Sequence, residues 1–75
     1  MTVLTAIELA GNYPENTKIE SQKATDGKFC SFLYMLRDGS IHKLMLSTKA
    51  VFETAKDAED ALHELGQRAV KEYGS

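Results

Sequence analysis

The sequence has one cysteine, one proline and no tryptophan among its 75 residues. A single thiol, Cys30, cannot form an internal disulfide, so a secreted disulfide scaffold is excluded and a reducing cytoplasm is expected. No apolar run approaches the roughly 20 residues that cross a bilayer. The first ten residues also lack the basic start of a signal peptide. We therefore expect a cytoplasmic protein with no membrane partner.

The chain also lacks an excess of charge of one sign. Nine lysines and arginines face eleven acidic residues, which gives a net charge of -2. Such a balance creates no general attraction for nucleic acid or an anionic membrane. The apolar content of 43% is typical of a globular protein, so we expect a single domain over residues 1–75. Domains of this size bury only about 60% of the surface that the unfolded chain exposes, and oligomerisation is a common way to stabilise them.

Motifs for catalysis or cofactor binding are absent from the sequence. The histidines, His42 and His63, and the thiol of Cys30 are too few and too scattered for a zinc site. The glycines form no phosphate-binding loop. The carboxylates of residues 57–64 belong to the solvated side of a predicted helix, not to a cleft. We therefore expect a protein that is not an enzyme, with no catalytic residue, cofactor or metal.

Three β-strands are predicted between residues 17 and 47. The stretch Phe29–Ser47 is strongly β-prone and is interrupted by Asp38-Gly39, a pair typical of two-residue hairpin turns. Asp26-Gly27 offers the same turn one strand earlier, after the alternating segment Thr17–Lys23. These features predict a three-stranded antiparallel meander whose first strand lies at an edge.

A helix is predicted on each side of this meander. Thr54 and Gly74 are suitable caps for a C-terminal amphipathic helix from Ala55 to about Tyr73. The segment before residue 13 is ambiguous, because its apolar residues alternate as in a strand. Its capping-box spacing from Thr5 nevertheless favours a short helix from about Ala6 to Ala10. The fold class is therefore α+β, in the order (α)βββα.

The sheet carries more apolar side chains than one helix can cover. With two-residue turns, Ile19 lies opposite Tyr34 and Tyr34 lies opposite Lys43, so these residues share a face with Phe32. If the C-terminal helix covers that face, five large side chains on the other face form a candidate protein interface. They are Phe29, Leu33, Met35, Leu44 and Leu46.

Three arrangements remain open for this second face. The N-terminal segment could fold across it, two copies could pair through sheet faces or edge strands, or another protein could bind. We expect a small non-enzymatic protein that acts through protein–protein interaction as a homodimer. Compact chains of this kind are common in bacteria and phages, which is the origin we expect.

Nucleic-acid binding is the alternative function. Six cations of the strand region would make the contacts: Lys18, Lys23, Lys28, Arg37, Lys43 and Lys49. The order of elements over Lys18–Tyr73 is similar to the DNA-binding domains at the N-termini of tyrosine recombinases. With a first helix it also resembles the αβββα layout of double-stranded RNA-binding domains. The basic helix start of the latter family is replaced here by the acidic segment Thr54–Asp60, which would repel phosphate.

Overall fold

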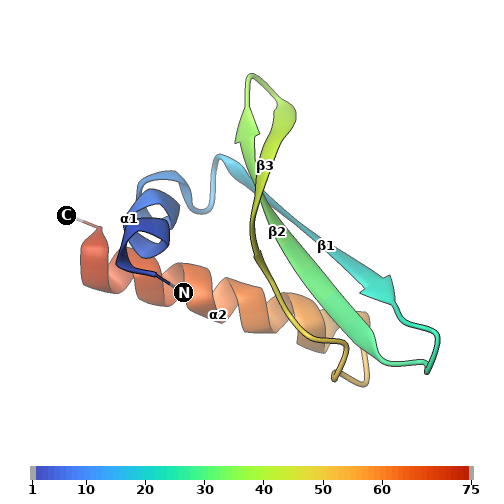
Figure 1. The fold of residues 1–75 in the computed structure, drawn as a ribbon. Helices are drawn as coiled ribbons and strands as arrows, with labels where there is room; N and C mark the ends of the chain where they lie inside the picture. The colour runs from blue at the N-terminus through green and yellow to red at the C-terminus, as the bar shows by residue number, and fades with distance from the viewer. Residues whose placement is uncertain (1, 75) are drawn as a thin grey trace.

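The computed structural model describes residues 2–74 and has the predicted order αβββα. The elements are α1 (Val3–Asn12), β1 (Thr17–Lys23), β2 (Phe29–Arg37), β3 (Ser40–Ser47) and α2 (Ala55–Tyr73). The strands form one antiparallel sheet in the order β1-β2-β3. Figure 1 shows α1 beside the C-terminal half of α2, with both helices on one side of the sheet. The α+β fold class is confirmed.

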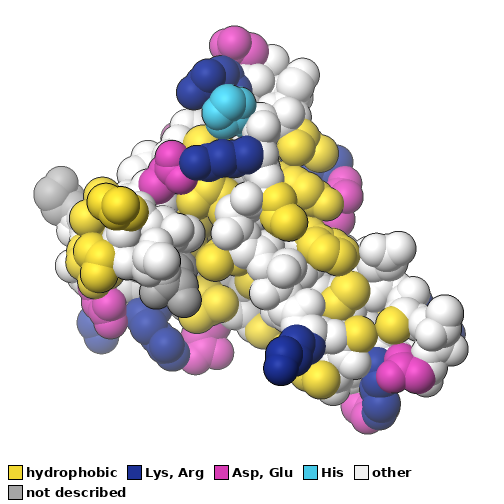
Figure 2. Space-filling view, in the orientation of Figure 1, with side chains coloured by type: hydrophobic (Ala, Val, Ile, Leu, Met, Phe, Trp, Pro, Cys, Tyr) yellow, Lys and Arg dark blue, Asp and Glu magenta, His cyan; other side chains and the backbone are white. Residues whose placement is uncertain are grey.

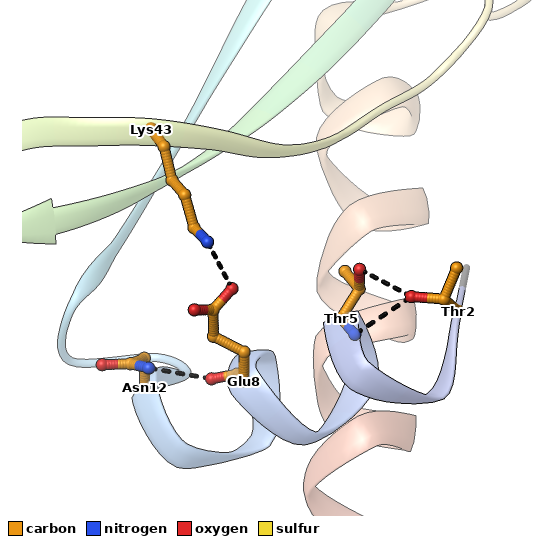
Figure 3. Close-up of polar contacts among 5 residues, drawn as sticks. All are labelled: Thr2, Thr5, Glu8, Asn12 and Lys43. Atoms are coloured by element: carbon orange, nitrogen blue, oxygen red, sulfur yellow. Dashed lines mark hydrogen bonds and ion pairs between the residues drawn. The ribbon is translucent and has the colours of Figure 1, made fainter.

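The first helix is longer than predicted. Its N-cap is Thr2, whose hydroxyl accepts a hydrogen bond from the Thr5 backbone amide at 3.2 Å, so Thr5 lies inside the helix (Figure 3). Gly11 also lies inside the helix, whose C-cap is Tyr13. The side-chain amide nitrogen of Asn12, Nδ2, donates to the backbone carbonyl of Glu8 at 2.8 Å in the last turn. Helix is therefore correct for this segment, while the predicted bounds Ala6 to Ala10 are too short.

The second helix has the predicted bounds. The Thr54 hydroxyl accepts from the Asp57 amide at 3.0 Å, and Gly74 follows the last turn. Four residues spaced by three or four positions are buried along one stripe, as expected for an amphipathic helix packed on a sheet. They are Ala58, Leu62, Gly66 and Ala69.

The core joins both helices to the central strand. Leu9 of α1, Leu33 of β2 and Leu62 of α2 are all fully buried and belong to one cluster. Ser31 is also fully buried, and its hydroxyl donates to the Ala58 carbonyl at 2.6 Å. Ser31, Leu33 and Met35 therefore point to the helices, because alternate residues of a strand share a face.

The register between β1 and β2 differs from the prediction by one residue. The Ala24 amide donates to the Lys28 carbonyl at 2.7 Å, and the Gly27 amide donates to the Ala24 carbonyl at 3.0 Å. Gly27 has a φ of +87°, so the loop contains the three residues 25–27 instead of two. Ile19 consequently lies opposite Leu33, not Tyr34. A slip of one residue exchanges the two faces.

The second hairpin begins in the predicted register. Asp38 and Gly39 both have positive φ, and Leu36 lies opposite Ile41. Two irregularities then shift the pairing of β2 with β3, so that Tyr34 lies opposite Leu44, not Lys43. Bulges of this kind place an extra residue on one strand. As a result the adjacent residues Met45 and Leu46 both pack against the core.

Tyr13, which follows α1, connects the two helices through contacts of its side chain with α2. Its hydroxyl lies 2.7 Å from Nδ1 of His63, and burial raises the pKa of the Tyr13 phenol. The Tyr13 ring lies so close to Gly66 that a Cβ at this position would be 2.6 Å from ring carbons. Gly66 thus permits the close approach of this ring, because it has no side chain.

This contact gives a prediction for two matched substitutions. Alanine is better than glycine in a helix by about 1 kcal/mol, so Gly11→Ala, which meets no atom within 4 Å, should raise the free energy of unfolding. Gly66→Ala gains the same propensity but must displace Tyr13, at an overpacking cost of about 1–3 kcal/mol. Urea unfolding should therefore rank Gly66→Ala below Gly11→Ala by that difference. Equal stabilities would contradict the tight Tyr13 contact.

Candidate protein-binding surface

The predicted interface residues do not form a solvent-facing surface. Leu33 is fully buried and Met35 is only 7% exposed, because the shifted register turns them toward the helices. Phe29 and Leu46 are half-buried, and Leu46 packs against the core. Leu44 is the member that lies largely in solvent, at 51% exposure. The surplus of apolar surface exists, but it lies on the opposite face of the sheet.

We call that opposite side the open face. It carries the residues of β2 that alternate with the buried ones, together with their partners on β3. Its apolar members are Cys30, Phe32, Tyr34, Leu36, Ile41 and Leu44. Neither helix packs on this face, because both lie on the Leu33 side (Figure 1). The open face is therefore an uncovered apolar surface.

The residues at its centre shield one another only in part. The rings of Phe32 and Tyr34 lie 6.4 Å apart at an interplanar angle of 29°. Ile41 is 50% exposed, close to the value for Leu44. Figure 2 shows apolar side chains gathered over β3, and a separate group over α1. Large apolar side chains that lie together in solvent are a mark of interaction surfaces.

The margin of the open face along β1 is polar and carries both charges. Lys18, Glu20 and Gln22 alternate with half-buried residues of this strand. The Lys18 Nζ lies 2.9 Å from Oε1 of Glu20, and each side chain is about half exposed. This hydrogen bond, with the negative charge of Glu20, raises the pKa of the Lys18 ammonium. The margin therefore holds one positive and one negative group side by side.

The six cations expected to contact nucleic acid point in different directions. Lys18 lies on the open face, opposite Tyr34. Lys43 lies opposite Met35 and pairs with Glu8 of α1 at 2.7 Å (Figure 3), so it belongs to the helix side. Lys28 forms an ion pair with Glu53.

The other three cations lie in different parts of the strand region. The Lys23 ammonium lies 5.9 Å from the centre of the Phe29 ring. Arg37 ends β2 beside the hairpin turn, and Lys49 follows β3. The structure therefore does not gather the six on one face.

A second group of exposed apolar residues lies on α1. Val3, Leu4 and Ile7 are 59%, 80% and 49% exposed. A shallow depression of about 460 Å³ lies beside them, between Ile7 and the end of α2 at Val70 and Tyr73. This group lies on α1, on the opposite side of the sheet from the open face.

Of the three side chains considered for catalysis or metal binding, two make contacts within the fold and one is exposed. The Cys30 thiol lies on the open face and is 3.5 Å from the Gln22 carbonyl. His63 is engaged by Tyr13, while His42 is exposed on β3. Within residues 2–74, no group of three His, Cys, Asp or Glu side chains is placed to hold a metal ion. No helix in this range is long and apolar enough to cross a membrane.

Comparison with known proteins adds no relative. No family model, no curated protein and no solved structure matches this chain. The likeness to double-stranded RNA-binding domains therefore rests on the order of elements alone. A functional assignment must rest on the geometry of the chain's own surfaces.

The exchange of faces can be tested with two aspartate substitutions. Leu33→Asp places a charge in the core and should abolish the cooperative unfolding transition, since its cost of several kcal/mol is comparable with the stability of a small domain. Leu44→Asp lies in solvent and should change the stability of the monomer by less than about 1 kcal/mol. Circular dichroism at low protein concentration measures both. A folded Leu33→Asp variant would contradict the observed register.

Proposed function

We propose that this protein acts by binding protein, and that its partner is a second copy of itself on the open face. The proposal is carried by one observation: an apolar face of the sheet that neither helix covers. Fully burying an exposed large apolar side chain contributes roughly 1.5–3 kcal/mol. Ile41 and Leu44 are about half exposed, and Phe32, Tyr34 and Leu36 are already partly buried, so each contributes part of that amount and the five together favour association.

The overall dimensions support association. The chain exposes 5005 Å², whereas a folded monomer of 8.3 kDa is expected to expose roughly 4,600 Å². Its radius of gyration of 12.4 Å also exceeds the value of about 11.4 Å for a compact domain of this length. The shortest extent is 18 Å, as expected for one sheet and one helical layer. A third layer on the open face would bury the surplus surface.

The charge of the open face favours a second copy over another kind of partner. Its margin contains Lys18 and Glu20 and has no net charge, so it selects neither an acidic nor a basic partner. A partner that matches it needs an apolar centre and a margin with both charges. The open face itself has these properties, and two-fold dimers are the commonest homo-oligomers.

The solution mass tests this proposal. Light scattering from about 10 µM to 1 mM should approach twice the chain mass of 8.3 kDa as the concentration rises. Leu44→Asp should remain monomeric, because each interface would then bury two carboxylates. Leu4→Asp makes the same change on α1, at a residue 80% exposed and away from the open face, and should dimerise like the parent. A parent protein that stays monomeric throughout would refute the proposal.

The alternative, nucleic-acid binding, is favoured by one observation on the same face. Phe32 and Tyr34 lie side by side with Lys18 opposite Tyr34, an arrangement that could stack bases of a single strand. A labelled oligonucleotide should then bind with a salt-dependent affinity. Lys18→Glu should weaken the binding strongly, because Lys18 is the lysine opposite Tyr34, whereas Lys43→Glu on the helix side should have little effect. Binding that survives Lys18→Glu with the same salt slope would contradict this role of Lys18.

A further inference from the structure

The open face is organised in rows that cross the strands. One row consists of Lys18, Tyr34 and Leu44, which are opposite one another in the register. The next row on this face consists of Glu20, Phe32 and Ser47. Rows on one face are two residues apart, or roughly 6.6 Å along the strands. Each row thus begins with a charge on β1 and continues with an aromatic ring on β2.

This layout distinguishes the two ways in which such a face can pack on a copy of itself. A two-fold axis parallel to the strands would place β1 of one subunit over β3 of the other. Lys18 would then be buried against Leu44 and Glu20 would face Ser47, with no charge of the other subunit opposite either of them. Burying the Lys18–Glu20 ion pair without a charged partner across the interface costs more desolvation free energy than it returns.

An axis that crosses the strands gives a different result. If it passes at the level of Ile19 and Leu33, it lies midway between the two rows and exchanges them. The charge of one row then faces the opposite charge of the other row in the partner subunit, and the aromatic ring of one row faces the aromatic ring of the other. No charge of the margin is left without a partner.

Building on the proposed function, we propose that the homodimer has its two-fold axis across the strands at the level of Ile19 and Leu33. Lys18 of each subunit then pairs with Glu20 of the partner subunit, and Phe32 packs on Tyr34 of the partner subunit. Packed sheets lie about 10 Å apart, a gap that a lysine and a glutamate bridge together. The ion pair of 2.9 Å within each subunit is exchanged for two pairs between subunits.

Charge reversal tests this axis directly. Lys18→Glu gives a subunit with two acidic residues in the margin, and Glu20→Lys gives one with two basic residues. Each variant alone should dimerise at least about tenfold more weakly than the parent, because two contacts change from attraction to repulsion. An equal mixture of the two should form a heterodimer with parent-like affinity, since both contacts are then attractive. Native mass spectrometry with one variant isotope-labelled resolves homodimer from heterodimer.

The chain offers a matched control for these reversals. Lys56 and Asp60 form an ion pair of 3.0 Å on α2, with both side chains more than half exposed. Lys56→Glu and Asp60→Lys change the net charge in the same ways but lie away from the open face. These two variants should dimerise like the parent, alone and mixed. Circular dichroism should show every variant folded, because single exposed ion pairs contribute little to stability.

The outcomes separate the axis from the proposed function. A monomeric parent would refute both proposals. A dimeric parent that Leu44→Asp dissociates, but whose affinity is unchanged by Lys18→Glu and Glu20→Lys, would refute the axis and leave the function intact. Weakening by both variants without rescue in the mixture would also refute the axis. Rescue that disappears at high salt supports it, since exposed charge pairs are screened.

Discussion

The three-residue loop between β1 and β2 determines which face of the sheet packs against the helices. Gly27 closes this loop in a left-handed conformation, and the pairing of Ile19 with Leu33 follows from it. Because side chains alternate with a period of two, this pairing fixes the face on which every other β2 side chain lies. It places Ser31 and Leu33 against α2, and it turns Phe32 outward. A loop one residue shorter would require the opposite assignment.

Much of the fold could be predicted because its signals are local. Thr54 and Gly74 define α2 through capping chemistry that involves only neighbouring residues. Asp38 and Gly39 form a turn whose positive φ values these residue types tolerate. The bounds of β1 likewise follow from its own alternation. In these segments the sequence and the tertiary structure agree.

The candidate site could not be predicted, because it depends on the length of the loop between β1 and β2, which the sequence leaves ambiguous. Asp-Gly fits a two-residue loop, but a glycine at the last position also fits a three-residue loop. The hydrophobic pattern did not decide between them, since Phe32 and Leu33 are both large and apolar. The first sign that the shorter loop was wrong is structural: the pair Ala24 and Lys28, joined at 2.7 Å. A two-residue loop therefore predicts Phe32 and Tyr34 on the covered side, whereas the observed loop turns them outward.

The sheet edges are less suited to association than the open face. The β1 edge carries Lys18, Glu20 and Lys23, and charged edge strands resist pairing with another strand. The pairing of β2 with β3 contains two register shifts, which twist the other edge. A regular six-stranded sheet built from two copies is therefore unfavourable. These features favour face-to-face packing over edge pairing for the proposed dimer.

Folding and the proposed association thus use alternate residues of one strand. The odd-numbered residues of β2, from Ser31 to Met35, hold the domain together through α2 and Leu9. The even-numbered residues, from Phe32 to Leu36, point away from the helices and do not belong to the core, so a partner could contact them. A change at an even position therefore alters the open face while the helices remain packed on the other side. The open face can therefore vary in sequence without loss of the fold, since the two sets of side chains lie on opposite faces of a single sheet.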